Sequence, residues 1–163
     1  MKKILILTAS IIIVISSCKK KDQAPEDTIS VTIDGVNENF TKIIYAGIGS
    51  TTTASKSHLL ITGINPNNND LIDLEIDASS KIVKGNYSND VNLPVLVNYG
   101  VGNPSKAITE EYQTNGTKIN STAIAITSLS DTKIEGTFSA ILDGGSGKPL
   151  KTATSGKFNI TFK

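Results

Sequence analysis

Apolar and polar residues alternate along most of this chain, and the clearest case is the segment LIDLEID at 71–77. Ile72, Leu74 and Ile76 would face one way. Each is followed by one acidic residue, and these three acidic residues would face the other way. Successive side chains of a β-strand point to opposite faces of a sheet, so a period of two indicates a strand with one buried face. No segment keeps the three- and four-residue apolar spacing of an amphipathic helix over three turns. The chain beyond its N-terminal region is therefore predicted to be all-β.

A series of such segments is separated by runs of Gly, Asn, Asp and Pro, which favour turns. This arrangement predicts an antiparallel β-sandwich or a β-barrel-like domain. The stretch at 104–113 is the one segment expected to hold a short helical turn. The predicted strands lie at 29–40 (with a turn inside it), 41–48, 58–64, 71–77, 81–87, 93–99, 121–129, 133–142 and 155–163.

Turn residues predict which strands pair. Asp34 and Gly35 suit a type I′ turn, in which both central residues have positive φ. The loop NPNNND at 65–70 predicts a second hairpin. The last two strands should form a third, in which Gly136 marks a bulge or a close approach of another segment. The residues expected to face the core from these two strands are Ile134, Phe138, Ala140, Leu142, Phe158, Ile160 and Phe162.

The N-terminal segment has the order of a secretory signal. Lys2 and Lys3 give a positive start, an apolar run occupies 4–15, and two serines come directly before Cys18. The apolar run is shorter than the roughly 20 residues that cross a bilayer. Residues 1–17 are therefore predicted to be a signal peptide that is removed.

The tetrapeptide ISSC at 15–18 has an aliphatic residue, two small residues and a cysteine, and in this it resembles the lipobox of bacterial lipoproteins. The resemblance implies a diacylglycerol on the Cys18 thiol, cleavage before Cys18 and acylation of the new amino terminus. It also implies a lipid-anchored protein of the cell envelope. In Gram-negative lipoproteins the residues just after the cysteine can decide between inner membrane, outer membrane and cell surface, and the charged stretch at 19–27 resembles those of lipoproteins displayed on the outer face. Lipidation would explain why Cys18 is the only cysteine of an exported chain.

Residues 18–27 are predicted to form the lipidated Cys18 and a flexible tether. The stretch KKKDQAPED at 19–27 is charged and lacks apolar periodicity, so it has too little apolar surface to order itself. Residues 28–163 then form a single all-β domain, which their number permits.

The two ends of this domain resemble small, uncharacterised lipoproteins of Gram-negative bacteria. Those proteins have a hairpin with a Thr-Ile-x-Gly pattern near the start and Gly-x-Phe patterns in their closing strands. The resemblance implies a fold and no activity, because the shared residues are packing and turn residues. They are Ile33, Asp34, Gly35, Gly136, Thr137, Phe138, Gly156, Lys157, Phe158 and Phe162.

Charge and glycine motifs exclude several function classes. The net charge is +1 at pH 7, and all 16 basic residues are lysines. Arginine is the usual bidentate ligand of phosphate and guanine, so its absence argues against a nucleic-acid partner. In GGSGKP at 144–149, Leu142 stands where a P-loop needs its first Gly and Pro149 where it needs Ser or Thr. GIGS at 47–50 lacks the third glycine of a dinucleotide motif, so no cofactor is expected.

His58, the only histidine, is expected to be an ordinary surface or strand-edge residue. The chain has no Gly-x-Ser-x-Gly elbow that would accompany a hydrolytic triad. A zinc site is not expected, because one histidine is present and Cys18 is assigned to the lipid. We therefore predict no catalytic residues, no metal ligands and no enzyme.

Asp70, Asp73, Glu75 and Asp77 follow an Asn-rich loop, and their oxygens are of the kind that hard cations bind. The last three would lie about 7 Å apart in succession along one strand face, too far for one ion unless a loop contributes. The pattern favours a solvated strand face and leaves cation binding within 70–77 open. Glycoside hydrolysis by paired carboxylates is disfavoured, because such clefts are lined with aromatic residues and this chain has no Trp and four Tyr.

Thr28 lies in the tripeptide DTI, which resembles the Asp-Ser/Thr-aliphatic sites of one bacterial O-glycosylation system. At the end of the tether it is expected to be exposed, and the resemblance implies a sugar on its hydroxyl.

Two functions fit these observations. The first is a lipid-anchored, non-catalytic binding module that is held at the membrane by Cys18 and contacts a protein or a glycan. The alternative is a lipocalin-like carrier of a small apolar ligand inside a closed barrel. The carrier requires that Ala123, Ala125, Gly136 and Ala140 face inward and leave space there.

Overall fold

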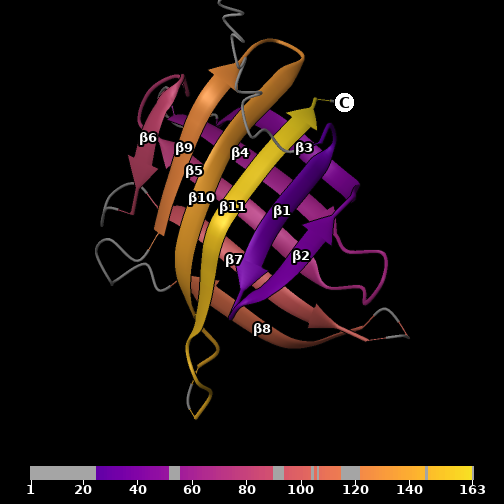
Figure 1. Cartoon of the computed structure of the whole chain (residues 1–163). Coiled ribbons are helices and arrows are strands. Elements are labelled where there is room, and N and C mark those ends of the chain that lie inside the picture. Colours follow the sequence, from indigo (N-terminus) through magenta and orange to yellow (C-terminus); the bar gives the residue numbers. More distant parts are fainter. Residues whose placement is uncertain are drawn as a thin grey trace, which may run out of the picture.

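The computed structural model describes residues 25–51, 56–89, 94–103, 105, 107–114, 122–145 and 147–162, and these contain no α-helix. Eleven strands form one continuous antiparallel sheet (Figure 1). The predicted all-β, antiparallel fold is confirmed. The strands are β1 (Thr28–Ile33), β2 (Val36–Phe40), β3 (Lys42–Thr51), β4 (Lys56–Ile64), β5 (Leu71–Ala78), β6 (Gly85–Ser88), β7 (Val95–Gly102), β8 (Ile108–Thr114), β9 (Thr122–Leu129), β10 (Lys133–Asp143) and β11 (Lys151–Thr161).

The sheet folds back on itself into two layers. The front layer has the order β2-β1-β11-β10-β9-β6, and the back layer has the order β8-β7-β5-β4-β3. Strand β10 joins them, because its first part pairs with β9 and its last two residues pair with β8. Figure 1 shows the strands of the back layer running obliquely across those of the front layer. Strands β2 and β3 lie at the two ends of the path and do not pair with each other in the described part of the chain, so the domain is an open sandwich and not a closed barrel.

The long hairpin β10–β11 sets the length of the front layer. Each strand has eleven residues, which at about 3.3 Å per residue span roughly 35 Å. At one end, which we call the entry end, the chain enters β1 beside the β9–β10 turn and the last residues of β11. At the other end, the far end, the β1–β2 turn lies beside the β10–β11 loop.

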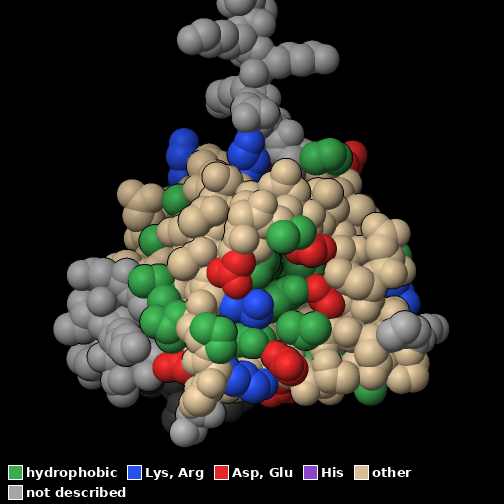
Figure 2. Space-filling view, turned by 60° about the horizontal axis from the view of Figure 1, so that its bottom comes forward, with side chains coloured by type: hydrophobic (Ala, Val, Ile, Leu, Met, Phe, Trp, Pro, Cys, Tyr) green, Lys and Arg blue, Asp and Glu red, His purple; other side chains and the backbone are tan. Residues whose placement is uncertain are grey.

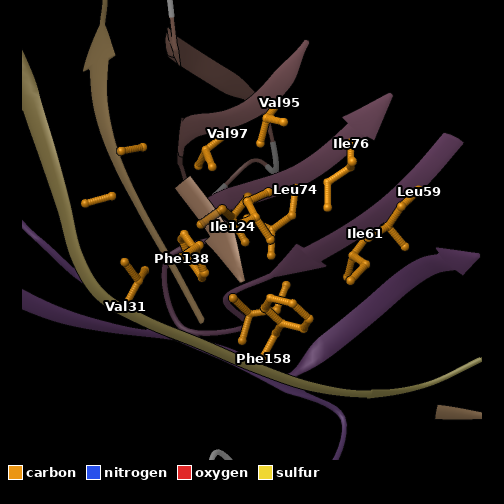
Figure 3. Packing of buried hydrophobic residues seen from close by; sticks show 14 of the residues in the cluster. Val31, Leu59, Ile61, Leu74, Ile76, Val95, Val97, Ile124, Phe138 and Phe158 are labelled. Atoms are coloured by element: carbon orange, nitrogen blue, oxygen red, sulfur yellow. The ribbon is translucent and has the colours of Figure 1, made fainter. Parts of the chain in front are cut away.

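Apolar side chains from both layers fill the space between them (Figure 3). In β5 the predicted alternation is confirmed, since Ile72, Leu74 and Ile76 are fully buried and the residues between them are partly exposed. Figure 3 shows Phe138 and Phe158 of the front layer facing this group. Ile, Leu and Val build most of the core, which suits a chain without Trp.

The three predicted hairpins are confirmed. Asp34 and Gly35 have φ values of 48° and 85°, as a type I′ turn requires. Strands β4 and β5 pair from Ser57 to Ile64 across the predicted loop. Strands β10 and β11 pair along most of their length.

Two predictions of secondary structure are wrong. The expected helical turn at 104–113 lies in part on β8, which pairs with β7 through Tyr99 and Tyr112; the backbone hydrogen bonds of the sheet override the helical preference of the two glutamates. The expected strand at 81–87 is shortened to β6. Its first part is not a strand, because the Tyr87 hydroxyl binds both the N–H and the carbonyl of Val83 at 2.9 and 2.7 Å.

Candidate functional site

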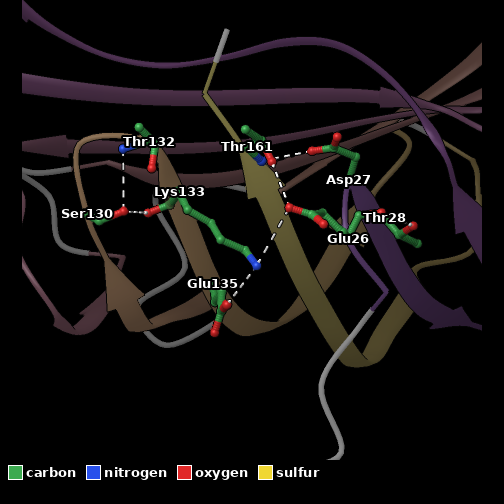
Figure 4. A network of polar contacts seen from close by, with 8 residues as sticks. All are labelled: Glu26, Asp27, Thr28, Ser130, Thr132, Lys133, Glu135 and Thr161. Carbon is green, nitrogen blue, oxygen red and sulfur yellow. Dashed lines mark hydrogen bonds and ion pairs between the residues drawn. The ribbon is translucent and has the colours of Figure 1, made fainter.

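The chain enters the domain through Glu26 and Asp27, which are hydrogen-bonded to the last strand (Figure 4). The Thr161 N–H donates to an Asp27 carboxylate oxygen at 2.8 Å, and the Thr161 hydroxyl donates to Glu26 at 3.3 Å. The ammonium of Lys133 lies 4.0 Å from the same Glu26 oxygen. These two residues, expected in the tether, therefore belong to the domain, while Cys18 lies outside the described residues.

Thr28 is buried and not exposed as expected, since only 6% of it is accessible. It begins β1 and pairs with Asn159 of β11, and its hydroxyl donates to the Glu26 carbonyl at 3.3 Å. The expectation of exposure was wrong because the strand begins where the tether was expected to end. O-glycosylation of Thr28 stays a prediction, and it would have to occur before this strand packs.

His58 lies opposite Asp77 in the β4–β5 pair, and the structure brings it together with two of the acidic residues. Its Nδ1 atom lies 2.7 Å from an Asp77 carboxylate oxygen and 3.7 Å from a Glu75 carboxylate oxygen. In the sequence, His58 and the acidic strand lie more than ten residues apart, and no motif links them. Their meeting depends on the register of the hairpin.

Burial raises the pKa of Glu75 above its ordinary value, and the nearby carboxylates of Asp77 and Asp73 raise it further, whereas His58 lowers it. Burial also raises the pKa of Asp73, against a hydrogen bond with Thr62 that lowers it. Asp70 does not join this group. It is buried beside β7, where it accepts hydrogen bonds from the Tyr99 hydroxyl and from the Gly102 N–H.

His58, Glu75 and Asp77 can offer one nitrogen and two oxygens that lie within 4.8 Å of one another, and they are the one such set among the described residues. Imidazole and carboxylate ligands suit Zn²⁺. The observed imidazole–carboxylate hydrogen bond satisfies the same atoms without a metal. This set alone therefore assigns no metal to the protein.

The far end of the sandwich has exposed apolar side chains beside charged ones. Val36 next to the β1–β2 turn and Leu150 before β11 are 59% and 50% exposed. Figure 2 looks onto this end and shows hydrophobic side chains at its centre, with lysine, aspartate and glutamate side chains among and around them. We define the far-end surface as Asp34, Val36, Glu110, Tyr112, Lys148, Leu150 and Lys151.

Tyr112 is the centre of the charged part of this surface. The ammonium groups of Lys148 and Lys151 lie 5.4 and 4.9 Å from the centre of its ring, within the range of a cation–π interaction. Its hydroxyl donates to Glu110 at 2.8 Å, and Lys148 lies 3.7 Å from the same carboxylate. The Tyr112 hydrogen bond and Lys148 lower the pKa of Glu110, so this carboxylate stays ionised to a lower pH than an ordinary glutamate.

Asp34 fastens the β1–β2 turn to the same surface. Its carboxylate accepts a hydrogen bond from the Thr152 N–H at 2.8 Å and lies 3.2 Å from the Lys151 ammonium. The hydrogen bond from Thr152 lowers the pKa of Asp34, despite the opposing effect of desolvation, and Lys151 lowers it further. Lys151 contacts both Asp34 and the Tyr112 ring, so the β1–β2 turn, the start of β11 and β8 are held together at this surface.

The four small residues that the carrier hypothesis requires do not form one lining. Ala123 is exposed, and Ala125 is partly exposed. Gly136 and Ala140 face inward, but a Cβ on Gly136 would lie 2.3 Å from the ring of Phe158, so that space is occupied. These positions therefore give the carrier hypothesis no support.

No protein-family model, curated protein or solved structure matches this chain. Along the described part of the chain, no helix is long and apolar enough to cross a membrane.

Proposed function

We propose that this protein is a lipid-anchored, non-catalytic binding module of the Gram-negative cell envelope, held by Cys18 and contacting its partner through the far-end surface. Residues 1–17 act as the signal peptide, and the segment after Cys18 acts as the leash. The outer membrane is the proposed site of anchoring.

The proposal is supported by the position of the far-end surface, which lies at the opposite end of the domain from the point where the chain enters. The chain from Cys18 enters the domain at the entry end, whereas Val36 and Leu150 are exposed at the far end. The long β10–β11 hairpin separates the two ends by roughly 35 Å. An anchor on one end of a rigid sandwich leaves the other end accessible to a partner.

A protein partner fits the far-end surface better than a glycan does. Sugar-binding surfaces offer exposed aromatic rings, but Tyr112 is 4% exposed beneath its two lysines. Exposed aliphatic side chains surrounded by charges resemble the apolar centre and polar rim of a protein interface. The carrier function has no comparable observation in its favour.

The anchor is tested by expressing the full chain in a Gram-negative host and determining the mass of the N-terminal peptide of the membrane-bound protein. We expect a peptide that begins at Cys18 and carries acyl chains, and a Cys18→Ser variant that lacks them. A wild-type protein that is recovered without acyl chains would contradict the proposal.

The far-end surface is tested in the same host with a photo-crosslinking amino acid at position 150. We expect protein adducts from this position and none from position 123 on the outer face of β9, where Ala123 is also exposed. Equal adducts at both positions, or none at position 150, would contradict a contact role for the far-end surface.

A further inference from the structure

An apolar groove of about 550 Å³ lies at the entry end, on the side away from the far-end surface. Ile48 of β3, Val83 of the 81–84 segment, Leu129 at the end of β9 and Phe162 after β11 contribute its apolar lining. Val83 and Ile48 are 53% and 38% exposed, and the other two are partly buried against the core. We call this the entry-end groove.

The shape of the groove is built into the fold. The Tyr87 hydroxyl binds both backbone groups of Val83, which keeps the 81–84 segment out of the sheet and turns the Val83 side chain outward. Ile82 beside it is buried in the core and fixes the segment from the other side. On the opposite wall, the Phe162 N–H donates to the Thr132 carbonyl at 2.9 Å.

The groove lies beside the point where the chain from Cys18 enters the domain. Thr161, which binds Asp27 and Glu26, directly precedes Phe162 of the groove. Cys18 precedes Pro25 by seven residues, and an extended chain of that length reaches at most about 25 Å. A lipid on Cys18 would therefore keep this end of the domain close to the bilayer.

The rim of the groove has the charge that an anionic membrane surface attracts. Lys81 and Lys84 are both exposed, and neither forms an ion pair within the described part of the chain. Asp131 is the acidic residue of the lining. A lysine near an anionic surface strengthens binding to it, and its methylene stem can lie along the apolar lining.

We infer that the entry-end groove rests on the membrane, with anionic phospholipid of the anchoring bilayer as its occupant. Val83 and Ile48 enter the boundary between headgroups and acyl chains, and Lys81 and Lys84 contact the phosphates. This inference rests on the proposed function, because the lipid on Cys18 supplies the proximity. It adds an orientation, since a domain that rests on its entry end turns the far-end surface away from the bilayer.

The chain has no tryptophan, so one introduced tryptophan reports its own surroundings. Val83→Trp and Ile48→Trp place it at the groove, and Val36→Trp is the matched control on the far end. Each full-length variant is isolated from a Gram-negative host and reconstituted with vesicles of phosphatidylethanolamine and phosphatidylglycerol that contain brominated acyl chains. Flotation of the vesicles shows whether the protein is anchored, and bromine quenching shows which residue meets the lipid.

We expect both groove variants to be quenched about twofold or more, because interfacial side chains lie about 5–10 Å deep, and Val36→Trp to be unaffected. Replacing Lys81 and Lys84 by Glu in the Val83→Trp protein should abolish that difference. Protein that floats but shows no more quenching at the groove than at position 36 would overturn the inference and leave the anchor intact. An emission change at position 83 that depends on protein concentration and not on vesicles would overturn it in favour of a second copy. Protein that fails to float would instead contradict the proposed anchor.

Discussion

Gly136 occupies a place where a side chain has no room. A Cβ on this residue would lie 2.2 Å from the Ala125 carbonyl oxygen of β9 and 2.3 Å from the ring of Phe158. The register of β9 and β10 shifts between Glu135 and Gly136, so the backbones come close at a bulge. The glycine is therefore required for packing.

Gly136→Ala is expected to lower the free energy of unfolding by about 3 kcal/mol, because two neighbouring segments would have to move apart. Urea denaturation measures the loss. Gly85→Ala in β6 is the matched control, since nothing lies within 4 Å of its added methyl. Equal stability of the two variants would contradict the packing requirement, because it would mean that β9 and β10 can move apart at Gly136 without loss of stability.

Asp73→Asn is expected to stabilise the protein at neutral pH. Burial raises the pKa of Asp73 above its ordinary value of 3.8, so this carboxyl group begins to oppose folding as the pH rises above that value and does so fully above its pKa in the folded state. As the pH falls below 3.8, the carboxyl is protonated in both states and the advantage of the variant disappears.

Urea denaturation of wild type and Asp73→Asn at pH 7 and near pH 3 checks both halves of this prediction. Asp131→Asn, on the exposed β9–β10 turn, controls for the loss of one charge. Destabilisation of Asp73→Asn at pH 7 would mean that the hydrogen bond with Thr62 outweighs burial of the charge.

At the scale of elements, Asp70 holds the loop between β4 and β5 against β7. Asp70 is 4% exposed and accepts hydrogen bonds from the Tyr99 hydroxyl, from the Gly102 N–H at 2.8 Å and from the Asn68 amide at 3.0 Å. Burial raises the pKa of the Tyr99 hydroxyl strongly, and the hydrogen bond to Asp70 and the nearby carboxylates raise it further. This network joins the loop to β7.

Asp70→Ala is expected to destabilise the protein by roughly 3 kcal/mol, because it leaves buried donors of two elements without an acceptor. Tyr99→Phe should cost only about 1 kcal/mol, since the carboxylate keeps its other donors. Chemical denaturation compares the two variants. A loss in Asp70→Ala no larger than that in Tyr99→Phe would contradict the fastening role.

At the scale of elements, hairpins could be predicted from sequence and irregular segments could not. The Asp34-Gly35 turn and the alternation in β5 depend on neighbouring residues, so the local pattern determined them. The segment before β6 was missed because it depends on the Tyr87 hydroxyl reaching back to Val83. Strand β8 was missed because its pairing with β7 overrides local preference.

At the scale of the whole molecule, β11 is the strand on which the front layer depends. It lies between β1 and β10 in the sheet, although it is the last strand in sequence. Phe158, Ile160 and Ala153 are buried on it. Without β11, the β1–β2 hairpin would have no neighbouring strand in the front layer.

A chain that ends at residue 150 is therefore expected to remain unfolded, although it retains ten of the eleven strands. Circular dichroism during urea titration should show no cooperative transition, and amide exchange should show no protected core. A chain that begins at Pro25 is the matched control and should unfold cooperatively. A cooperative transition in the shortened chain would show that the back layer is stable alone.

A candidate site could be proposed from the sequence only where its residues lie close together in the chain. The signal at 15–18 is contiguous, so sequence alone suffices to propose Cys18, which stays a prediction because it lies outside the described residues. His58 and Asp77 were both singled out, but only the β4–β5 register places them together. The far-end surface and the entry-end groove combine segments from several strands, and no local pattern marks them.

The position of β1 has a mechanical consequence for a protein held by its N-terminus. β1 begins at the entry end, runs toward the far end and is hydrogen-bonded along both edges, to β2 and to β11. A partner that pulls on the far-end surface would load these hydrogen bonds in shear along the strand axis. The bonds of both edges would then have to break together and not one after another as in unzipping. Under the proposed anchoring through Cys18, the domain would transmit tension from a bound partner to the membrane without unravelling at its attachment point.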